Sequence, residues 1–97
     1  EINKDNQALI TQPGTVVLKF YADRCGPCKS YNTVFDAVAK KLEDTVNFLT
    51  IDIDAFPDLA KTYYVRSIPA TVIIKNGVEV DKRIGTLTES QLVNLIN

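Results

Sequence analysis

The sequence predicts an α/β fold of three layers, with a central mixed sheet of four or five strands between layers formed by about four helices. Segments rich in β-branched residues alternate along the chain with segments whose apolar residues recur every three or four positions. Such alternation is typical of parallel β-α-β units. Asn76-Gly77 lies between two strand-like segments and is a strong signal for a type I′ hairpin. A β-α-β unit followed by a hairpin implies a mixed sheet with helices on both faces.

The first strong strand is expected at residues 15–22, where β-branched and aromatic residues form a nearly unbroken apolar run. Such a run indicates a strand buried on both faces, and Lys19 in its middle is an anomaly. Before this strand, Asp5 or Asn6 can cap a short helix. Residues 1–3 are expected to form either a short edge strand or a frayed terminus.

A long helix is expected from about Gly26 or Pro27 to Leu42. Proline is compatible with the first turn of a helix, because its missing N–H would have no partner there. The buried stripe of this helix is predicted to consist of Cys28, Tyr31, Phe35, Val38 and Leu42. The remaining predicted elements are a strand at 46–53, a short helix at about 58–63, a loop at 65–69, strands at 70–75 and 78–84, and a final helix through Ile96. Thr88 and Gln91, three residues apart, form a capping box at the start of this final helix.

The composition restricts the class of protein. The 97 residues, of which 45% are hydrophobic, suffice for one domain with one core, which we assign to residues 1–97. A net charge of −1 gives no broad electrostatic surface for nucleic acid or membrane. No apolar run approaches the roughly 18 residues of a membrane span, and no signal-peptide pattern opens the chain. We therefore expect a cytoplasmic protein that is by default a monomer.

Cys25 and Cys28 are the only cysteines, and they lie at the predicted turn from strand to long helix. The N-terminus of a helix favours negative charge, so it lowers the pKa of a thiol and stabilises the nucleophilic thiolate. Cys28, one turn further into the helix, is expected to face the interior. This asymmetry predicts that Cys25 attacks a substrate and that Cys28 resolves the intermediate.

Two structural interpretations of the cysteine pair remain beside the catalytic one. A disulfide of purely structural use would close so short a loop that it would remove little chain entropy. Half of a zinc site would need further ligands. The chain has no histidine and no other cysteine, so carboxylates or a second chain would have to supply them. We therefore expect no metal.

The chain resembles the thioredoxin family over about Val16 to Ile96, in motifs that follow the family's order and spacing. The motifs are Phe20-Tyr21-Ala22, Cys25-Gly26-Pro27-Cys28-Lys29, Ile51-Asp52-Ile53-Asp54, Arg66-Ser67-Ile68-Pro69, Asn76-Gly77 and Gly85. The resemblance implies a thioredoxin fold, a cis peptide bond at Ile68–Pro69 next to the cysteines, and no cofactor other than the redox-active disulfide. Without the resemblance, Pro69 can be interpreted simply as a proline that leads into a strand.

The resemblance also implies the activity of a protein-disulfide reductase. Cys25 would attack a disulfide in a substrate protein, Cys28 would release the reduced substrate, and an external donor such as a thioredoxin reductase would reduce the resulting disulfide. The backbone of Ile68 would pair with the extended substrate chain. The implied docking and supporting positions are Arg24, Gly26, Pro27, Ser67, Ile68, Pro69, Ala70, Ile84 and Gly85.

The chain departs from the family pattern near the cysteines. Arg24 stands where the family usually has a tryptophan; it would favour the Cys25 thiolate and acidic partners, or it is solvated with little effect. Lys19 stands where the family carries a buried aspartate, and Thr50 where it has the paired lysine. A lone buried cation would favour thiolate over disulfide and make the protein a stronger oxidant. Thr33 replaces a proline at which the long helix often kinks, so we expect a straighter helix or a kink of different cause.

Two alternative functions stay open on these grounds. The first is a thiol oxidase or isomerase of an oxidising compartment, which Arg24 and Lys19 favour. The second is a non-catalytic binding module that keeps the fold and the docking groove but does not turn over.

Overall fold

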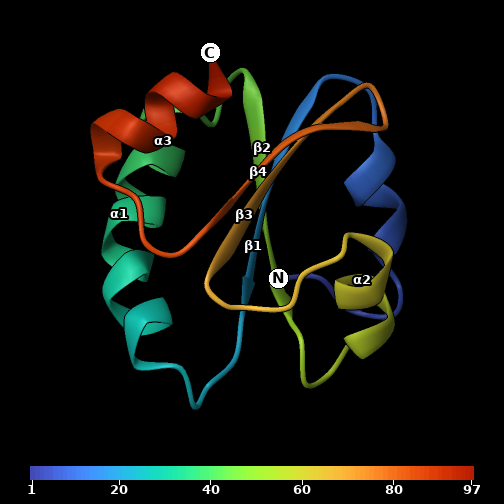
Figure 1. Cartoon of the computed structure of the whole chain (residues 1–97). Coiled ribbons are helices and arrows are strands. Elements are labelled where there is room, and N and C mark those ends of the chain that lie inside the picture. The colour runs from blue at the N-terminus through green and yellow to red at the C-terminus, as the bar shows by residue number, and fades with distance from the viewer.

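The computed structural model describes residues 1–97 and contains four strands, three α-helices and one 3-10 helix. In chain order the elements are η1 (Gln7–Thr11, 3-10), β1 (Thr15–Tyr21), α1 (Gly26–Leu42), β2 (Val46–Asp52), α2 (Pro57–Thr62), β3 (Ala70–Lys75), β4 (Val78–Ile84) and α3 (Glu89–Ile96). The strands form one sheet in the order β2-β1-β3-β4. Figure 1 shows α1 and α3 on one side of this sheet and η1 and α2 on the other, which confirms the predicted three-layer α/β fold.

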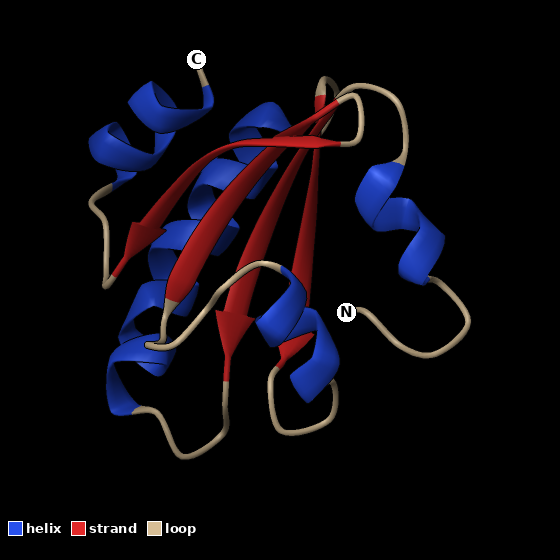
Figure 2. Ribbon diagram, turned by 45° about the vertical axis from the view of Figure 1, so that its right-hand side comes forward, coloured by secondary structure: helices blue, strands red, loops and turns tan.

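The two inner strands, β1 and β3, organise the sheet. β1 is parallel to β2 and antiparallel to β3, and β3 is antiparallel to β4. Figure 2 shows the four strands crossing the molecule between the helices. Because β1 is internal and both of its faces are covered by helices, residues 16–20 are all buried, as the apolar run predicts.

Alternate residues of β1 supply two separate parts of the core. Val16, Leu18 and Phe20 pack in the cluster on the side of η1 and α2, whereas Val17 packs with residues of α1 and α3. The period of two residues in a strand produces this division. Burying one Leu or Phe side chain stabilises the fold by about 1.5–3 kcal/mol. Both helical layers therefore contribute to the stability of the sheet.

Local signals in the sequence set several boundaries. Asn76 and Gly77 have φ values of 51° and 84°, the two positive values that a type I′ turn requires. Thr88 and Gln91 form both hydrogen bonds of the predicted capping box at the start of α3. α1 continues through Thr33 to Leu42 as one helix. None of the helices combines the length and the hydropathy needed to span a bilayer.

The N-terminal segment differs from the prediction. Residues 1–3 form neither a strand nor a frayed end, because Ile2 is buried and its N–H donates to the Thr50 carbonyl at 2.8 Å. The following helix is a 3-10 helix, so the α-helices number three rather than about four. Asn6 does not cap this helix with its side chain; its Oδ1 accepts from the Asn3 N–H at 2.7 Å. Short runs of this kind commonly take the 3-10 form.

Candidate active site

The two cysteines lie where β1 passes into α1. The Cys25 N–H donates to the Ala22 carbonyl at 3.1 Å, which closes the turn between strand and helix. Cys25 is the N-cap residue of α1, with extended φ and ψ of −92° and 107°, and its Sγ accepts from the Cys28 N–H at 3.1 Å. The sulfur therefore occupies the place that a capping oxygen usually takes.

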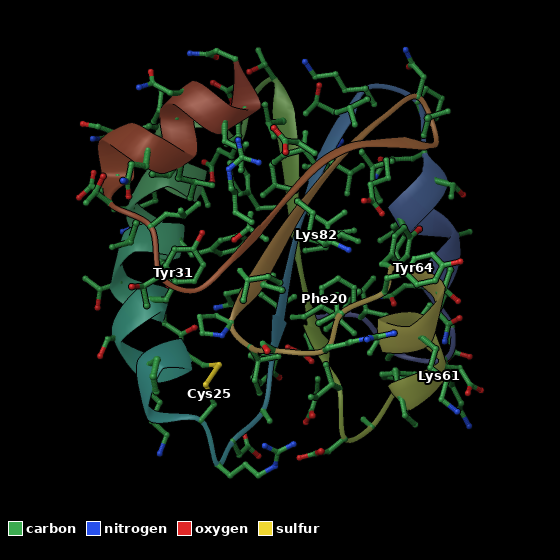
Figure 3. All side chains as sticks on the ribbon, in the orientation of Figure 1. Phe20, Cys25, Tyr31, Lys61, Tyr64 and Lys82 are labelled. Carbon is green, nitrogen blue, oxygen red and sulfur yellow. A yellow bond between two sulfur atoms is a disulfide. The ribbon has the colours of Figure 1, made fainter.

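Cys25 and Cys28 are joined by a disulfide, and their Cα atoms are 5.3 Å apart. Figure 3 shows this sulfur pair at the first turn of α1, close to the molecular surface. Cys25 is 8% exposed and Cys28 is 2% exposed. Gly26 and Pro27, between them, are both exposed. The asymmetry that the helix position predicts is therefore present, with Cys25 as the more accessible sulfur.

The Ile68–Pro69 peptide bond lies at the same end of the sheet as the cysteines. It is cis, the geometry that the family resemblance implies. It leads into β3, which is antiparallel to β1 and pairs Ala70 with Phe20 near the end of that strand. The Gly85 N–H donates to the Pro69 carbonyl at 2.8 Å, and this ties the start of β3 to the end of β4.

The predicted docking positions differ in accessibility. Ser67 is exposed, Ile68 is half-buried, and Ile84 is 53% exposed. Pro69 is buried and Ala70 has no exposed surface. The roles of Pro69 and Ala70 in docking stay predictions, and the inner position of β3 keeps both side chains buried beneath the surface.

The Lys19 side chain lies on the face of the sheet that α1 covers and is 4% exposed. Its Nζ donates a hydrogen bond to Oδ1 of Asn32 and lies 4.8 Å from the centre of the Phe35 ring. Burial lowers the pKa of the Lys19 ammonium, and the nearby carboxylates of Asp36 and Glu1 act in the opposite direction. Lys19 thus has a neutral amide partner and forms no ion pair, and its expected effect on the cysteines stays a prediction.

Glu1 and Lys19 line the same polar pocket. The Glu1 carboxylate accepts from the Thr50 hydroxyl at 2.6 Å and from the Tyr21 hydroxyl at 2.8 Å. Asn32, which binds Lys19, follows Cys28 by four residues, so both side chains lie on one face of α1. The pocket therefore approaches the buried cysteine to within about one helical turn. Its lining residues are Glu1, Lys19, Tyr21, Asn32, Asp36 and Thr50.

The Arg24 side chain reaches the loop after β2. Its Nη2 lies 3.3 Å from Oδ1 of Asp54, and both side chains are exposed, 65% and 57%. The carboxyl ends of the parallel strands β1 and β2 meet at this edge of the sheet, which brings the two residues together. Exposed pairs of this kind contribute at most about 1 kcal/mol, but Asp54 offsets the positive charge that the sequence places beside Cys25.

Three polar partners near the site were not predicted. They are Asn32 for Lys19, Asp54 for Arg24, and Thr71 for Tyr31, whose hydroxyls are 2.7 Å apart. Of these, Asn32 carried a usable signal, because a polar residue four positions after Cys28 interrupts the apolar face of α1. The chain has no group of three or more His, Cys, Asp or Glu side chains that could hold a metal ion.

Comparison with known proteins identifies the family. The family model described as Thioredoxin matches residues 2–97. The chain belongs to the thioredoxin family. The thioredoxin of Chlamydia trachomatis is 36% identical over 96 residues, which cover 99% of this chain and 93% of that protein. The thioredoxin of Rickettsia typhi is 39% identical over 82 residues, 84% of this chain and 78% of the relative.

Solved thioredoxin structures share the fold. The X-ray structure of Fasciola hepatica thioredoxin superposes with a TM-score of 0.83 at 34% identity, covering 92% of this chain and 86% of that one. As a member of the thioredoxin family with a Cys25–Cys28 pair, the protein is a thiol–disulfide oxidoreductase. It reduces protein disulfides by dithiol–disulfide exchange, and an external donor restores its own dithiol.

Proposed function

We propose that Cys25 is the attacking cysteine and Cys28 the resolving cysteine of this exchange. The observation that supports the assignment is the hydrogen bond from the Cys28 N–H to the Cys25 sulfur at the N-cap of a 17-residue helix. This N–H and the helix dipole stabilise a thiolate at Cys25. Cys28 is the less accessible sulfur, so it meets the substrate only after Cys25 is bound to it.

The exchange proceeds in two balanced steps. The Cys25 thiolate attacks one sulfur of the substrate disulfide, forms a mixed disulfide and releases the other substrate sulfur as a thiolate. The Cys28 thiolate then attacks Sγ of Cys25, forms the intramolecular disulfide and releases the second substrate thiolate. The substrate gains two electrons and the protein loses two. A donor, which we propose is a thioredoxin reductase, returns two electrons and two protons to the Cys25–Cys28 disulfide.

The substrate docks on the surface around the disulfide. Its extended chain pairs with the backbone at Ile68, beside Ser67 and Gly85, by addition of a short strand. Gly26 and Pro27 form the opposite margin, and they are exposed. Pro69 is buried and supports this surface from beneath; Arg24 and Lys19 act on it through charge. We further propose that residues 1–97 function as one monomeric domain in the cytoplasm, without a cofactor.

The roles of the two cysteines are tested with Cys28→Ser and Cys25→Ser, each pre-reduced and mixed with a disulfide-bonded protein such as insulin. Cys28→Ser is expected to accumulate a mixed disulfide through Cys25, visible by mass spectrometry without reductant, because no resolving thiol is present. Cys25→Ser is expected to give no adduct. Equal adduct formation by the two variants would reverse or remove the assignment.

A non-catalytic binding module is separated from this proposal by the same variants. If the protein only binds its partners, Cys25→Ser retains the full biological effect. If it acts by exchange, that variant loses it. The oxidase alternative rests on the charges of Arg24 and Lys19. Arg24 is paired with Asp54 and Lys19 donates to the neutral amide of Asn32, so the reduction potential of the Cys25–Cys28 pair has to decide between the two functions.

A further inference from the structure

An exposed aromatic ring lies beside the loop that carries the cis peptide bond. Tyr64 is 76% exposed, the most exposed large hydrophobic side chain of the protein. It precedes the residues 65–68 that lead to Pro69. Its φ is 55°, in the left-handed region that bulky L-residues avoid. The backbone therefore bears a cost for a ring that buries little surface within the molecule.

The end of α2 explains the backbone conformation but not the choice of residue. The Val65 N–H donates to the Ala60 carbonyl at 2.8 Å, and the Tyr64 N–H to the Lys61 carbonyl at 3.1 Å. These two bonds form a Schellman motif, in which the residue at the position of Tyr64 must be left-handed and is usually glycine. A tyrosine at this position is unfavourable for the helix end alone, so a role for its ring outside the helix accounts for it.

Lys82 of β4 contacts both the backbone at Tyr64 and its ring. Its Nζ donates to the carbonyls of Tyr63 and Tyr64 at 3.1 and 3.3 Å and lies 5.9 Å from the centre of the Tyr64 ring. Figure 3 shows the Lys82 and Tyr64 side chains pointing toward each other on the side of α2. The loop is thus held by α2 through its backbone and by β4 through this ammonium group.

The ring is continuous with the proposed docking surface. Lys82 pairs with Val72 and Ile84 pairs with Ala70, so Lys82 and Ile84 lie on the same face of β4, two residues apart. Two residues of a strand span about 6.6 Å. Ile84 is 53% exposed and precedes Gly85, whose N–H donates a hydrogen bond to the Pro69 carbonyl. Tyr64, Lys82 and Ile84 therefore form one strip, here called the Tyr64 strip, that leads to the cis peptide bond.

The charged side chains near the Tyr64 strip indicate the chemistry of the ligand that it binds. Lys82 lies at the ring, and Lys61 and Arg66 flank Tyr64 in the sequence, where both are exposed and form no ion pair within the chain. Glu79 is the acidic group near Tyr63, and Asp58 lies in the first turn of α2. The cations outnumber the acids, and the ring offers a free apolar face.

We propose that the Tyr64 strip is a specificity subsite that binds an aromatic side chain flanked by a carboxylate, in the extended segment of a disulfide-bearing substrate protein. The aromatic side chain packs on Tyr64 and Ile84, and the carboxylate lies among the cations. This inference rests on the proposed docking of substrates at Ile68. It adds a contact at one side of that docking surface, where Lys82 and Ile84 follow each other on the same face of β4.

The test uses pre-reduced protein in single turnover, without a reductase. The probes are peptides whose single cysteine is capped by 2-mercaptoethanol in a mixed disulfide. A Phe-Glu pair is placed two to five residues from the cysteine on either side, and the reference peptide has Ala-Ala. Reduction releases the peptide thiol and 2-mercaptoethanol and oxidises the Cys25–Cys28 pair. The best Phe-Glu peptide is expected to react at least fivefold faster than the reference.

Variants assign this preference to the strip. Tyr64→Gly, which suits the helix end, is expected to reduce the ratio of the two rates to less than twofold. A third peptide carries Phe-Gln in place of Phe-Glu. Lys82→Gln is expected to lower the preference for the Phe-Glu peptide over this Phe-Gln peptide. Val78→Ala is the matched control, because Val78 is also an exposed apolar residue of β4, at its far end, and should keep the ratio.

Three outcomes overturn the inference. The first is that the wild-type protein shows no preference for the Phe-Glu peptide at any position. The second is that Tyr64→Gly keeps this preference. The third is that Tyr64→Gly changes only the turnover driven by a thioredoxin reductase, which would make the strip a binding site for that donor. Failure of the proposed function has a different signature: the pre-reduced wild-type protein then reduces none of the peptides, the Ala-Ala reference included.

Discussion

The Lys19 ammonium lies inside the layer between the sheet and α1, where a charge is poorly solvated. One amide oxygen, from Asn32, accepts its hydrogen bond, and the Phe35 ring lies under the charge. The carboxylates of Asp36 and Glu1 are near enough to oppose the effect of burial. These side chains thus form a polar cluster around Lys19 within an otherwise apolar layer.

This cluster predicts a pH dependence of stability. The pKa of Lys19 is below its ordinary value of 10.5 in the folded protein because of burial. Between the folded and unfolded values, the unfolded state binds more protons, so the free energy of unfolding rises with pH as the pH approaches 10.5 from below. Lys19→Met lacks this titration. The difference in unfolding free energy, wild type minus Lys19→Met, is therefore expected to increase with pH.

The measurement is urea denaturation of both proteins at a series of pH values from neutral upward. Burial raises the pKa values of Tyr21, Tyr31 and Tyr63, which destabilises the folded state in alkali. Tyr31 and Tyr63 are common to both proteins. Tyr21→Phe is introduced into both, because the Tyr21 ring lies 5.7 Å from Nζ of Lys19 and its titration would otherwise differ between them. Parallel pH profiles for the two proteins would contradict the prediction.

The hydroxyl pair of Tyr31 and Thr71 is a second polar contact within the core. Both residues are buried, at 1% and 0% exposure, and the oxygens are 2.7 Å apart. Tyr31→Phe or Thr71→Val leaves one buried hydroxyl without a partner, and each is expected to lower stability by about 1–2 kcal/mol. The double variant is expected to be destabilised by less than the sum. Strict additivity in this double-mutant cycle, measured by urea denaturation, would show that the hydroxyls do not interact.

The ends of the helices are where element structure and chemistry meet in this protein. At the start of α1, the group that caps the helix is the Cys25 sulfur. At the end of α2, the residue in the left-handed position is Tyr64. In both places a reactive or exposed side chain stands where helix stability alone favours another residue, Ser, Thr, Asp or Asn at the first and Gly at the second.

Tyr64→Gly is accordingly expected to stabilise the protein by about 1 kcal/mol, because glycine adopts the left-handed conformation without steric cost. For a domain of this size, that corresponds to a rise in Tm of about 4–8 °C. Asn76→Gly is the matched control. Asn76 also has positive φ, 51°, but its Oδ1 accepts from the Gly14 N–H at 2.9 Å, so the substitution loses a bond and should not stabilise. A lower Tm for Tyr64→Gly would contradict the prediction.

At the scale of the whole molecule, the charged groups near the disulfide influence its reduction potential. Arg24 is paired with Asp54, Lys19 donates to the neutral amide of Asn32, and the carboxylates of Asp36 and Glu1 oppose the effect of burial on the Lys19 pKa. These partners reduce the extra stabilisation of the thiolates that two free cations would give. We therefore expect the potential of a reductant rather than that of an oxidant.

The reduction potential of the Cys25–Cys28 pair is expected to lie near that of thioredoxin itself, for which the reference value is about −270 mV, and far from the value of about −120 mV for a strong oxidant. Equilibration against graded thiol–disulfide buffers measures it. Asp54→Asn frees Arg24 and is expected to shift the potential toward the oxidising side. A wild-type potential near that of the strong oxidant would move the protein to the oxidase or isomerase class.

Local pattern was enough to predict the strands at β1 and β3, the limits of α1, the hairpin at Asn76-Gly77 and the capping box at Thr88. Each depends on residues two to four positions apart, whose interactions are the same in any fold that contains the element. The reactive pair was predictable for the same reason, since Cys25 and Cys28 lie within one turn of one helix. The 3-10 form of η1 was not, because so short a segment has no strong intrinsic preference.

The contacts that the prediction lacked join residues far apart in the chain. Lys19 and Asn32 are 13 positions apart, Arg24 and Asp54 are 30 apart, and Tyr31 and Thr71 are 40 apart. The inner position of β3 buries Ala70, and the packing of β4 against the loop after α2 holds Tyr64. Local periodicity specifies which face of an element is buried. Which polar groups meet depends on how the layers dock, because a side chain's partner is selected by distance in space rather than by position in the sequence.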